Sequence, residues 1–218
     1  MVKKPLVTIA IVVAIFASVG TAAAQDAGAR FTVGGGAGIS NPLHGDLQFQ
    51  APAWEISARG RPAAHLTIEA FVSEWRHTIE TTRLGVMVQG PAGPLGTAGA
   101  LSQRTRYLTQ AFGASLLPTF TIGRASIVVG GGANVMFIQH RFEQRLDNCV
   151  PATATPLNCG SFSNAYSDSS PGLHAVAGLD VRIAPRLIAF GEYRLVAPVK
   201  DPGSGHTAAV AGVRLALR

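Results

Sequence analysis

The stretch Leu173–Ile183, LHAVAGLDVRI, decides the fold, because its apolar and polar residues alternate with a period of two. Every second residue from Leu173 onward is Leu, Ala, Val or Ile, whereas the residues between them include His174, Asp180 and Arg182. A β-strand points successive side chains to opposite faces, so the pattern predicts a strand with one apolar and one polar face.

The same alternation recurs along the chain. Four further segments show it cleanly: Trp54–Gly60, Leu66–Ser73, Leu187–Leu195 and Thr207–Leu217. Three segments are strand-like but alternate less cleanly: about 30–39, 105–116 and 125–138. The clean segments reach the length that a tilted strand needs to cross a bilayer, about 9–11 residues, whereas strands of globular proteins usually have about 5–6. The sequence therefore predicts an all-β fold with eight strands.

The predicted connections alternate between short and long. Short turns are expected at Arg61–Ala64, near Pro118–Arg124 and at Ala184–Arg186. Long loops are expected at about 40–46, 78–104, 140–171 and 198–206. Long structureless loops are uncommon inside compact soluble domains. Short turns at one end and long loops at the other are typical of outer-membrane barrels.

Composition agrees with a strand-rich protein that has apolar surface to hide. The chain has 218 residues, of which 47% are hydrophobic and only 14% charged, and its mean hydropathy is +0.27. These values exclude an intrinsically disordered chain. With 25 Gly and 13 Pro, a helical bundle is also disfavoured.

The first residues have the order of a secretory signal peptide. Lys3 and Lys4 precede the apolar stretch Pro5–Val19, and small residues follow up to Ala24. We expect cleavage after Ala24, so that residues 1–24 are removed and residues 25–218 form one barrel domain. The alternative is an uncleaved anchor, for which the apolar stretch is short compared with the usual span of about 20 residues.

Removal of residues 1–24 leaves 16 basic residues against 12 acidic ones, and all the basic residues except Lys200 are arginines. No run of adjacent basic residues occurs among them. A nucleic-acid partner needs a concentrated basic patch, and an exported chain does not meet nucleic acid. The sequence therefore predicts no nucleic-acid partner.

Charged residues lie on one face of the predicted strands: Glu55, Arg59, Glu69, Asp180, Arg182, Glu192, Arg194 and Arg214. In a soluble barrel this face would be the solvated outside. In a membrane barrel it must be the interior, because a basic residue facing lipid at the midplane costs about 2–4 kcal/mol. The apolar face, rich in Ala, Leu, Val, Gly and Ile, favours the second arrangement. We expect an eight-stranded antiparallel up-and-down transmembrane β-barrel whose charges form an interior network.

This set of features resembles the small outer-membrane barrels of the OmpA/OmpX type. The likeness rests on the export signal, the eight strands, the short turns at one end, the sequence Glu192-Tyr193-Arg194 and the Gly-rich segment Thr32–Gly38. It implies a barrel with a side-chain-filled lumen and little or no channel activity, and contact with the barrel-assembly machinery during insertion. Such barrels commonly end in an aromatic residue, whereas this chain ends in Leu215-Ala216-Leu217-Arg218.

Two cysteines, Cys149 and Cys159, are expected to form a disulfide, because export leads to an oxidising compartment. Metal binding by the two thiols is the weaker alternative, since no further Cys or His completes a four-ligand set. The six histidines form no H-x-H or H-E-x-x-H pair: His44, His65, His77, His140, His174 and His206. The glycine runs 34–38 and 130–132 lack the strand-to-helix context of a phosphate-binding loop. No metal or cofactor is therefore expected.

Four arginines fall near the predicted outer rim: Arg76, Arg83, Arg104 and Arg106. Their bidentate guanidinium groups suit phosphate, so contact with lipopolysaccharide is one hypothesis and simple solvation is the other. No predicted strand places His and Ser together at i and i+2, so no catalytic residues are assigned. We expect a non-enzymatic outer-membrane protein with a structural or surface-interaction role. The alternatives are a soluble periplasmic lipocalin-like barrel that binds an apolar ligand, and a lipid-A-modifying outer-membrane enzyme.

Overall fold

The structure is a computed structural model that describes residues 31–43, 50–90, 93–151, 159–200 and 205–217. These residues form eight β-strands: β1 (Phe31–Pro42), β2 (Ala51–Ala63), β3 (Leu66–Gly90), β4 (Gly93–Ile122), β5 (Ala125–Pro151), β6 (Gly160–Ala184), β7 (Leu187–Pro198) and β8 (His206–Leu217). Among the described residues, no helix is long and apolar enough to cross a membrane. The predicted signal peptide, residues 1–24, lies outside the described part of the chain.

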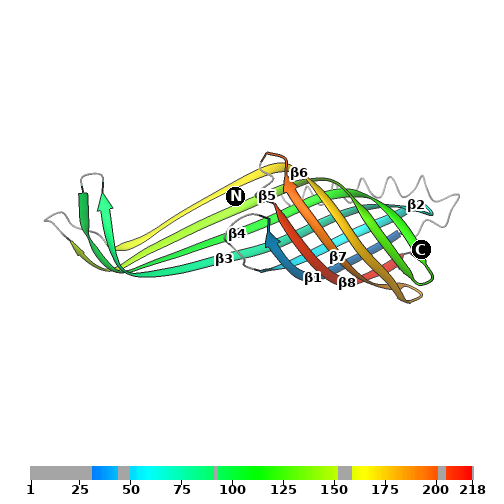
Figure 1. Ribbon diagram of the computed structural model, residues 1–218, viewed down its shortest axis with the longest axis horizontal. Helices are drawn as coiled ribbons and strands as arrows, with labels where there is room; N and C mark the ends of the chain where they lie inside the picture. The colour runs from blue at the N-terminus through cyan, green and yellow to red at the C-terminus, as the bar shows by residue number, and fades with distance from the viewer. Residues whose placement is uncertain (1–30, 44–49, 91–92, 152–158, 201–204, 218) are drawn as a thin grey trace. The chain divides into compact units, whose positions relative to one another are not determined.

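The strands close into a barrel in their sequence order, with β1 completing the ring between β2 and β8 (Figure 1). Both of these pairings are antiparallel, and Gly36 lies opposite Glu55 on one side and Gly212 on the other. The predicted all-β fold, with eight antiparallel strands in up-and-down order, is confirmed.

The chain divides into two compact units. The first contains the described residues up to Trp75, together with Gln110–Met136 and those from Ser170 onward. The second contains Arg76–Thr109 and Phe137–Ser169. Strands β3 to β6 have 25 to 30 residues each and contribute to both units, whereas β1, β2, β7 and β8 belong to the first unit alone.

The prediction of long loops at 78–104 and 140–171 is wrong. Strands β3, β4, β5 and β6 run through these segments, apart from short connections. Residues 78–84 and 160–169 are almost all exposed, so no apolar face alternates with a polar one there. β-branched residues such as those of Thr78-Ile79 still favour the extended conformation. A strand that is polar on both faces carries no period-two signal.

Three two-residue turns lie at one end of the barrel, which we call the turn end: Ala64–His65, Gly123–Arg124 and Pro185–Arg186. They are shorter than all three predicted turns, because β2 continues to Ala63, β4 continues past Pro118 to Ile122, and β6 continues to Ala184. Gly123 has a φ of 61°, a left-handed conformation that glycine adopts without a steric penalty.

The first unit has an apolar exterior and a mixed interior. Its large apolar side chains are exposed on the outward faces of the strands, among them Ile56, Leu179, Val213 and Leu215. The interior holds two groups of buried apolar side chains: one contains Ala53, Phe71, Trp75, Ala111, Met136, Phe190, Val196, Ala208 and Val210, and the other contains Leu117, Val128 and Val176. Buried charged residues occupy the space beside these groups, and they form the candidate site.

Candidate functional site

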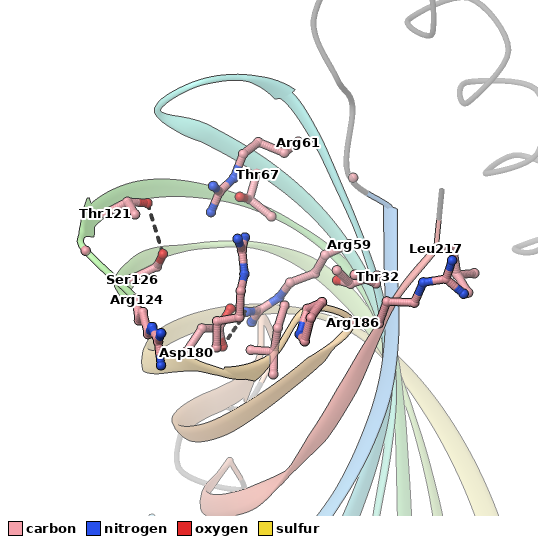
Figure 2. Close-up of a pocket in the computed structure, with 16 residues that line it drawn as sticks. Thr32, Arg59, Arg61, Thr67, Thr121, Arg124, Ser126, Asp180, Arg186 and Leu217 are labelled. Carbon is pink, nitrogen blue, oxygen red and sulfur yellow. Dashed lines mark hydrogen bonds and ion pairs between the residues drawn. The ribbon is translucent and has the colours of Figure 1, made fainter.

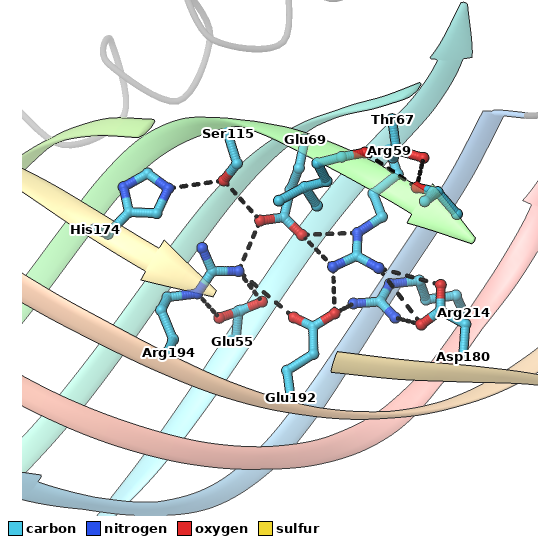
Figure 3. Close-up of polar contacts among 12 residues, drawn as sticks. Glu55, Arg59, Thr67, Glu69, Ser115, His174, Asp180, Glu192, Arg194 and Arg214 are labelled. Carbon is cyan, nitrogen blue, oxygen red and sulfur yellow. Dashed lines mark hydrogen bonds and ion pairs between the residues drawn. The ribbon is translucent and has the colours of Figure 1, made fainter. Parts of the chain in front are cut away.

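Seven charged side chains meet inside the first unit, and we call them the interior network: Glu55, Arg59, Glu69, Asp180, Glu192, Arg194 and Arg214. They come from β2, β3, β6, β7 and β8, and each occupies an inward position of its strand (Figure 3). Arg194 binds Glu55 through two hydrogen bonds, with Nε 2.9 Å from Oε2 and Nη2 3.1 Å from Oε1. Its Nη2 also donates to Glu69 Oε1 at 2.7 Å.

Arg59 and Arg214 share the remaining carboxylates. Arg59 donates from Nε to Glu69 Oε2 at 2.8 Å and from Nη1 to Asp180 Oδ2 at 3.1 Å, and it also binds Glu192. Arg214 donates from Nη1 to Asp180 Oδ1 at 2.7 Å and from Nη2 to Glu192 Oε1 at 2.6 Å. The network is therefore continuous across the barrel interior.

Aromatic rings pack against the guanidinium groups of this network, and glycines leave space for its side chains. The guanidinium of Arg194 lies 3.8 Å from the ring centroid of Phe71, and that of Arg214 lies 3.6 Å from the centroid of Phe190, so both cations are stabilised by ring faces. A Cβ atom at Gly34 would collide with Cγ of Arg214. Gly34 and Gly36 thus leave space in the interior for the long side chains of β7 and β8.

The carboxylates of the network are arranged as partners for arginine. One oxygen or more from each of Glu55, Glu69 and Glu192 lies within 4.8 Å of the others, a spacing that a metal ion could bridge. Every one of these carboxylates, however, accepts hydrogen bonds from guanidinium groups. Such fork-to-carboxylate bonds satisfy the buried charge of both partners. The arrangement rigidifies the interior and fills it.

Arg182 is the one predicted member that the structure does not place in the network. It is exposed, lies opposite Ile188 and sits three residues before the Pro185–Arg186 turn. Its parity matches that of Asp180, but the strand reaches the barrel mouth before Arg182. The parity of a residue determines which face of the strand its side chain lies on, but not how far the residue lies from the barrel mouth.

Ser115 and His174 form a buried pair that the sequence did not reveal. Ser115 Oγ lies 2.8 Å from His174 Nε2 and 3.0 Å from Glu69 Oε1, and the side-chain amide of Asn134 lies 3.4 Å from His174 Nδ1. Ser115 is on β4 and His174 is on β6, so a search for both on a single strand could not find them. Their shared inward parity was the available signal.

A Ser–His hydrogen bond is the usual start of nucleophilic catalysis, but this pair is closed to substrate. The exposed fraction is 2% for Ser115 and 5% for His174, and Phe71 packs edge-on to the imidazole with 4.8 Å between ring centroids. We therefore assign the pair to interior packing, and catalytic residues remain unassigned.

A cavity of about 340 Å³ opens at the turn end of the first unit, and we call it the turn-end cavity (Figure 2). Residues from all eight strands and two of the turns line it. Five of the lining residues are arginines and one is a carboxylate: Arg59, Arg61, Arg124, Arg182, Arg186 and Asp180. The cavity is therefore strongly positive.

The four arginines predicted at the outer rim all lie in the second unit. Arg104 pairs with Glu80 at 2.8 Å, and Arg106 lies 3.8 Å from Glu143. Arg76 and Arg83 are exposed.

Glu74 has the outward parity of its strand, the parity on which Leu66 and Ile68 lie. It is buried between two neighbours, accepting hydrogen bonds from Trp54 Nε1 at 3.3 Å and from Gln110 Nε2 at 2.7 Å. These neighbours shield the carboxylate from the surroundings of the barrel.

The predicted disulfide between Cys149 and Cys159 is confirmed, with 5.7 Å between the Cα atoms. It ties the last residues of β5 to the start of β6 within the second unit.

The second unit also contains a row of rings that crosses four strands. The centroid of His77 lies 6.4 Å from that of Tyr107, which lies 4.6 Å from that of His140, which in turn lies 4.6 Å from that of Tyr166. Burial lowers the pKa of His77 and raises that of Tyr107.

The remaining histidines are dispersed. His65 is exposed in a turn, and His206 packs against Trp75 with 5.0 Å between ring centroids. His44 lies outside the described residues.

Comparison with known proteins finds likeness in solved structures alone. No family model and no curated protein matches the sequence. Ail, the attachment invasion locus protein of Yersinia pestis, was solved in complex with the heparin analogue sucrose octasulfate; it is 10% identical and has a TM-score of 0.48, with 87% of this chain and 97% of Ail covered. Neisserial surface protein A is 13% identical with a TM-score of 0.46, covering 88% and 98% of the two chains. A major outer membrane protein from Thermus thermophilus is 12% identical with a TM-score of 0.47, covering 88% and 100%.

Proposed function

We propose that this protein is a non-enzymatic outer-membrane β-barrel with a structural or surface-interaction role. One observation carries the proposal: the first unit turns its large apolar side chains outward and encloses seven charged side chains. A soluble protein rarely exposes a contiguous apolar patch of more than a few hundred Å². In lipid the same surface is the favourable one.

The interior argues against the soluble alternative. A lipocalin-like barrel that binds an apolar ligand needs an open apolar cavity. Here the space is filled by the interior network and by packed side chains such as Phe71 and Phe190. The ion pairs would have to be broken before an apolar ligand could enter.

The filled interior also predicts little or no conductance. Eight strands enclose a space just wide enough for side chains. The network crosses this space and joins side chains of β2 and β3 to those of β7 and β8 (Figure 3). In a planar bilayer we expect no stable open state of porin size. A large and stable conductance would contradict the proposed role.

The surface role is assigned to the second unit. Strands β3 to β6 have 25 to 30 residues, more than the about 9–11 that a strand needs to cross a bilayer. The charges of the second unit form exposed pairs such as Arg104–Glu80. We propose that Arg76, Arg83, Arg104 and Arg106 contact phosphates of lipopolysaccharide, because guanidinium forks bind phosphate in bidentate fashion. Replacing Arg76 and Arg106 with Gln should then slow folding in the presence of lipopolysaccharide. An unchanged rate would remove this part of the proposal.

Fractionation together with gel mobility tests the proposed function. The protein should partition with outer membranes, and its mobility in SDS gels should change on boiling, because a closed barrel resists SDS until it is heated. Recovery in the osmotic-shock fraction would support the soluble alternative. A change in lipid A on overexpression would support a lipid-modifying enzyme.

A further inference from the structure

We propose that the turn-end cavity binds a phosphate group through Arg124, Arg182 and Arg186, with Arg59 and Arg61 completing its wall. The ligand class is a phosphate that is either free or part of an anionic phospholipid headgroup. Recognition of a headgroup rests on the proposed membrane location, whereas recognition of free phosphate does not.

The cavity is part of the fold. Backbone hydrogen bonds of 2.9 Å join Arg182 N to the carbonyl of Arg124, and Ala216 N to the carbonyl of Arg186. The first bond fixes the backbone of Arg182 relative to that of Arg124, and the second fixes the backbone of Arg186 against β8. The side chains of the three arginines are exposed. Its volume of about 340 Å³ is about ten times the share of one water molecule in the liquid, about 30 Å³. A phosphate group therefore fits together with several waters.

Three of the positive charges in the cavity, those of Arg124, Arg182 and Arg186, are not neutralised by neighbours in the described part of the chain. Asp180 is the one carboxylate among the described residues that line the cavity, and it already accepts hydrogen bonds from Arg59 and Arg214. Within the described chain, Arg124, Arg182 and Arg186 make no ion pair. The interior network has four carboxylates and three guanidinium groups, an excess of one negative charge. That excess does not balance the three positive charges of Arg124, Arg182 and Arg186.

The other lining groups suit an oxyanion. The hydroxyl groups of Thr32, Thr67, Thr121 and Ser126 face the same cavity, and Thr121 and Ser126 hydrogen-bond to each other at 2.9 Å (Figure 2). Hydroxyl groups donate hydrogen bonds to phosphate oxygens. Several guanidinium groups together match the two charges of free phosphate better than they match the single charge of a carboxylate.

The test uses the full chain folded in micelles of a detergent that contains no phosphate. Inorganic phosphate is titrated against chloride at matched ionic strength, and the amide and guanidinium NMR shifts are followed. The test variant is R124Q/R186Q, and its control R141Q/R145Q removes two exposed arginines from the second unit. Both variants must keep the heat-dependent gel shift of the barrel, which separates loss of binding from loss of fold.

We expect saturable shifts at Arg124, Arg182 and Arg186, at least about tenfold weaker binding in R124Q/R186Q because two charge-assisted donors are lost, and unchanged binding in the control. Absence of saturable shifts, or equal affinity in both variants, overturns the proposal. The source of the phosphate is assigned by native mass spectrometry. Phosphatidylglycerol that is retained by the wild type and lost in R124Q/R186Q identifies a headgroup, whereas equal retention together with phosphate binding in micelles identifies free phosphate.

Discussion

Strands β3 to β6 contribute to both units of the molecule, but the distribution of polar and apolar side chains over their two faces differs between the units. In the first unit most outward side chains are apolar, and the inward ones include seven charges that are paired with one another. In the second unit both faces carry polar side chains, and ion pairs such as Arg104–Glu80 lie at the surface. Strict alternation of apolar and polar side chains therefore reflects a difference in environment between the two faces of a strand. A strand whose two faces are both polar forms without it.

The difference also separates two kinds of ion pair. A buried pair is costly to break, about 3–5 kcal/mol, because the partner that remains keeps its charge in a place without water. An exposed pair contributes about 0–1 kcal/mol. The two units thus allow the same substitution to be made in both environments.

The largest effect is expected for Arg194→Met. This change leaves Glu55 without its guanidinium partner, removes one of the two guanidinium partners of Glu69, and removes the cation over Phe71. We expect the free energy of unfolding, measured by urea titration in lipid vesicles, to fall by about 3–5 kcal/mol. Arg104→Met in the second unit is the matched control, with an expected change of less than about 1 kcal/mol. Equal losses in the two variants would show that the network is not specially buried.

A smaller effect is expected when a charge is placed on the apolar exterior. Leu179 in the first unit is 46% exposed, and Leu84 in the second is 79% exposed. Leu179→Arg should lower stability in vesicles by about 2–4 kcal/mol, the cost of a basic residue facing lipid. Leu84→Arg should have little effect. A neutral Leu179→Arg would mean that this face meets water.

Reduction of the Cys149–Cys159 disulfide should affect the second unit alone. The bond closes a loop with a sequence separation of 10, and closure of such a loop contributes about 2–3 kcal/mol. We expect faster amide hydrogen exchange in residues 137–169 after reduction, with the heat-dependent gel shift of the barrel unchanged. Loss of the gel shift would indicate that the disulfide supports the barrel as well.

The smallest effect concerns pH and His77. Burial lowers the pKa of His77 below its ordinary value of 6.5, so the unfolded chain binds the proton more readily than the folded one. The contribution of this residue to stability is therefore complete above pH 6.5 and is lost as the pH falls through the folded pKa. Amide protection in residues 76–109, corrected for intrinsic exchange, should decrease between pH 7.5 and pH 5. His77→Gln should reduce that decrease, and an identical decrease would exclude His77 as its source.

The sequence predicts the barrel wherever one face is apolar and the other is polar. The alternation is clean in five of the eight strands and weaker in the other three, and it also gives the inward parity of residues such as Glu69 and Arg214. The segments 78–104 and 140–171 were predicted as loops, because a strand with two polar faces has no periodicity to detect.

Contacts across the interior were harder to predict than parity. Ser115 and His174 lie on β4 and β6, which are separated by β5, and their side chains meet inside the barrel because the sheet is curved. Arg182 was assigned to the network because parity gives the direction of a side chain and not its distance from the barrel mouth. The turn-end cavity gathers residues from eight strands, and no short motif records such an arrangement.

The central claim is that the apolar exterior of the first unit faces acyl chains while its interior is sealed. The chain has two tryptophans: Trp54 points outward and is 38% exposed, and Trp75 is in the interior and is 3% exposed. Two single-tryptophan variants, Trp75→Phe and Trp54→Phe, are folded into vesicles of lipids brominated along their acyl chains, and fluorescence quenching is measured. The account predicts strong quenching of Trp54 and little quenching of Trp75; quenching of Trp75 with Trp54 left unquenched would contradict it.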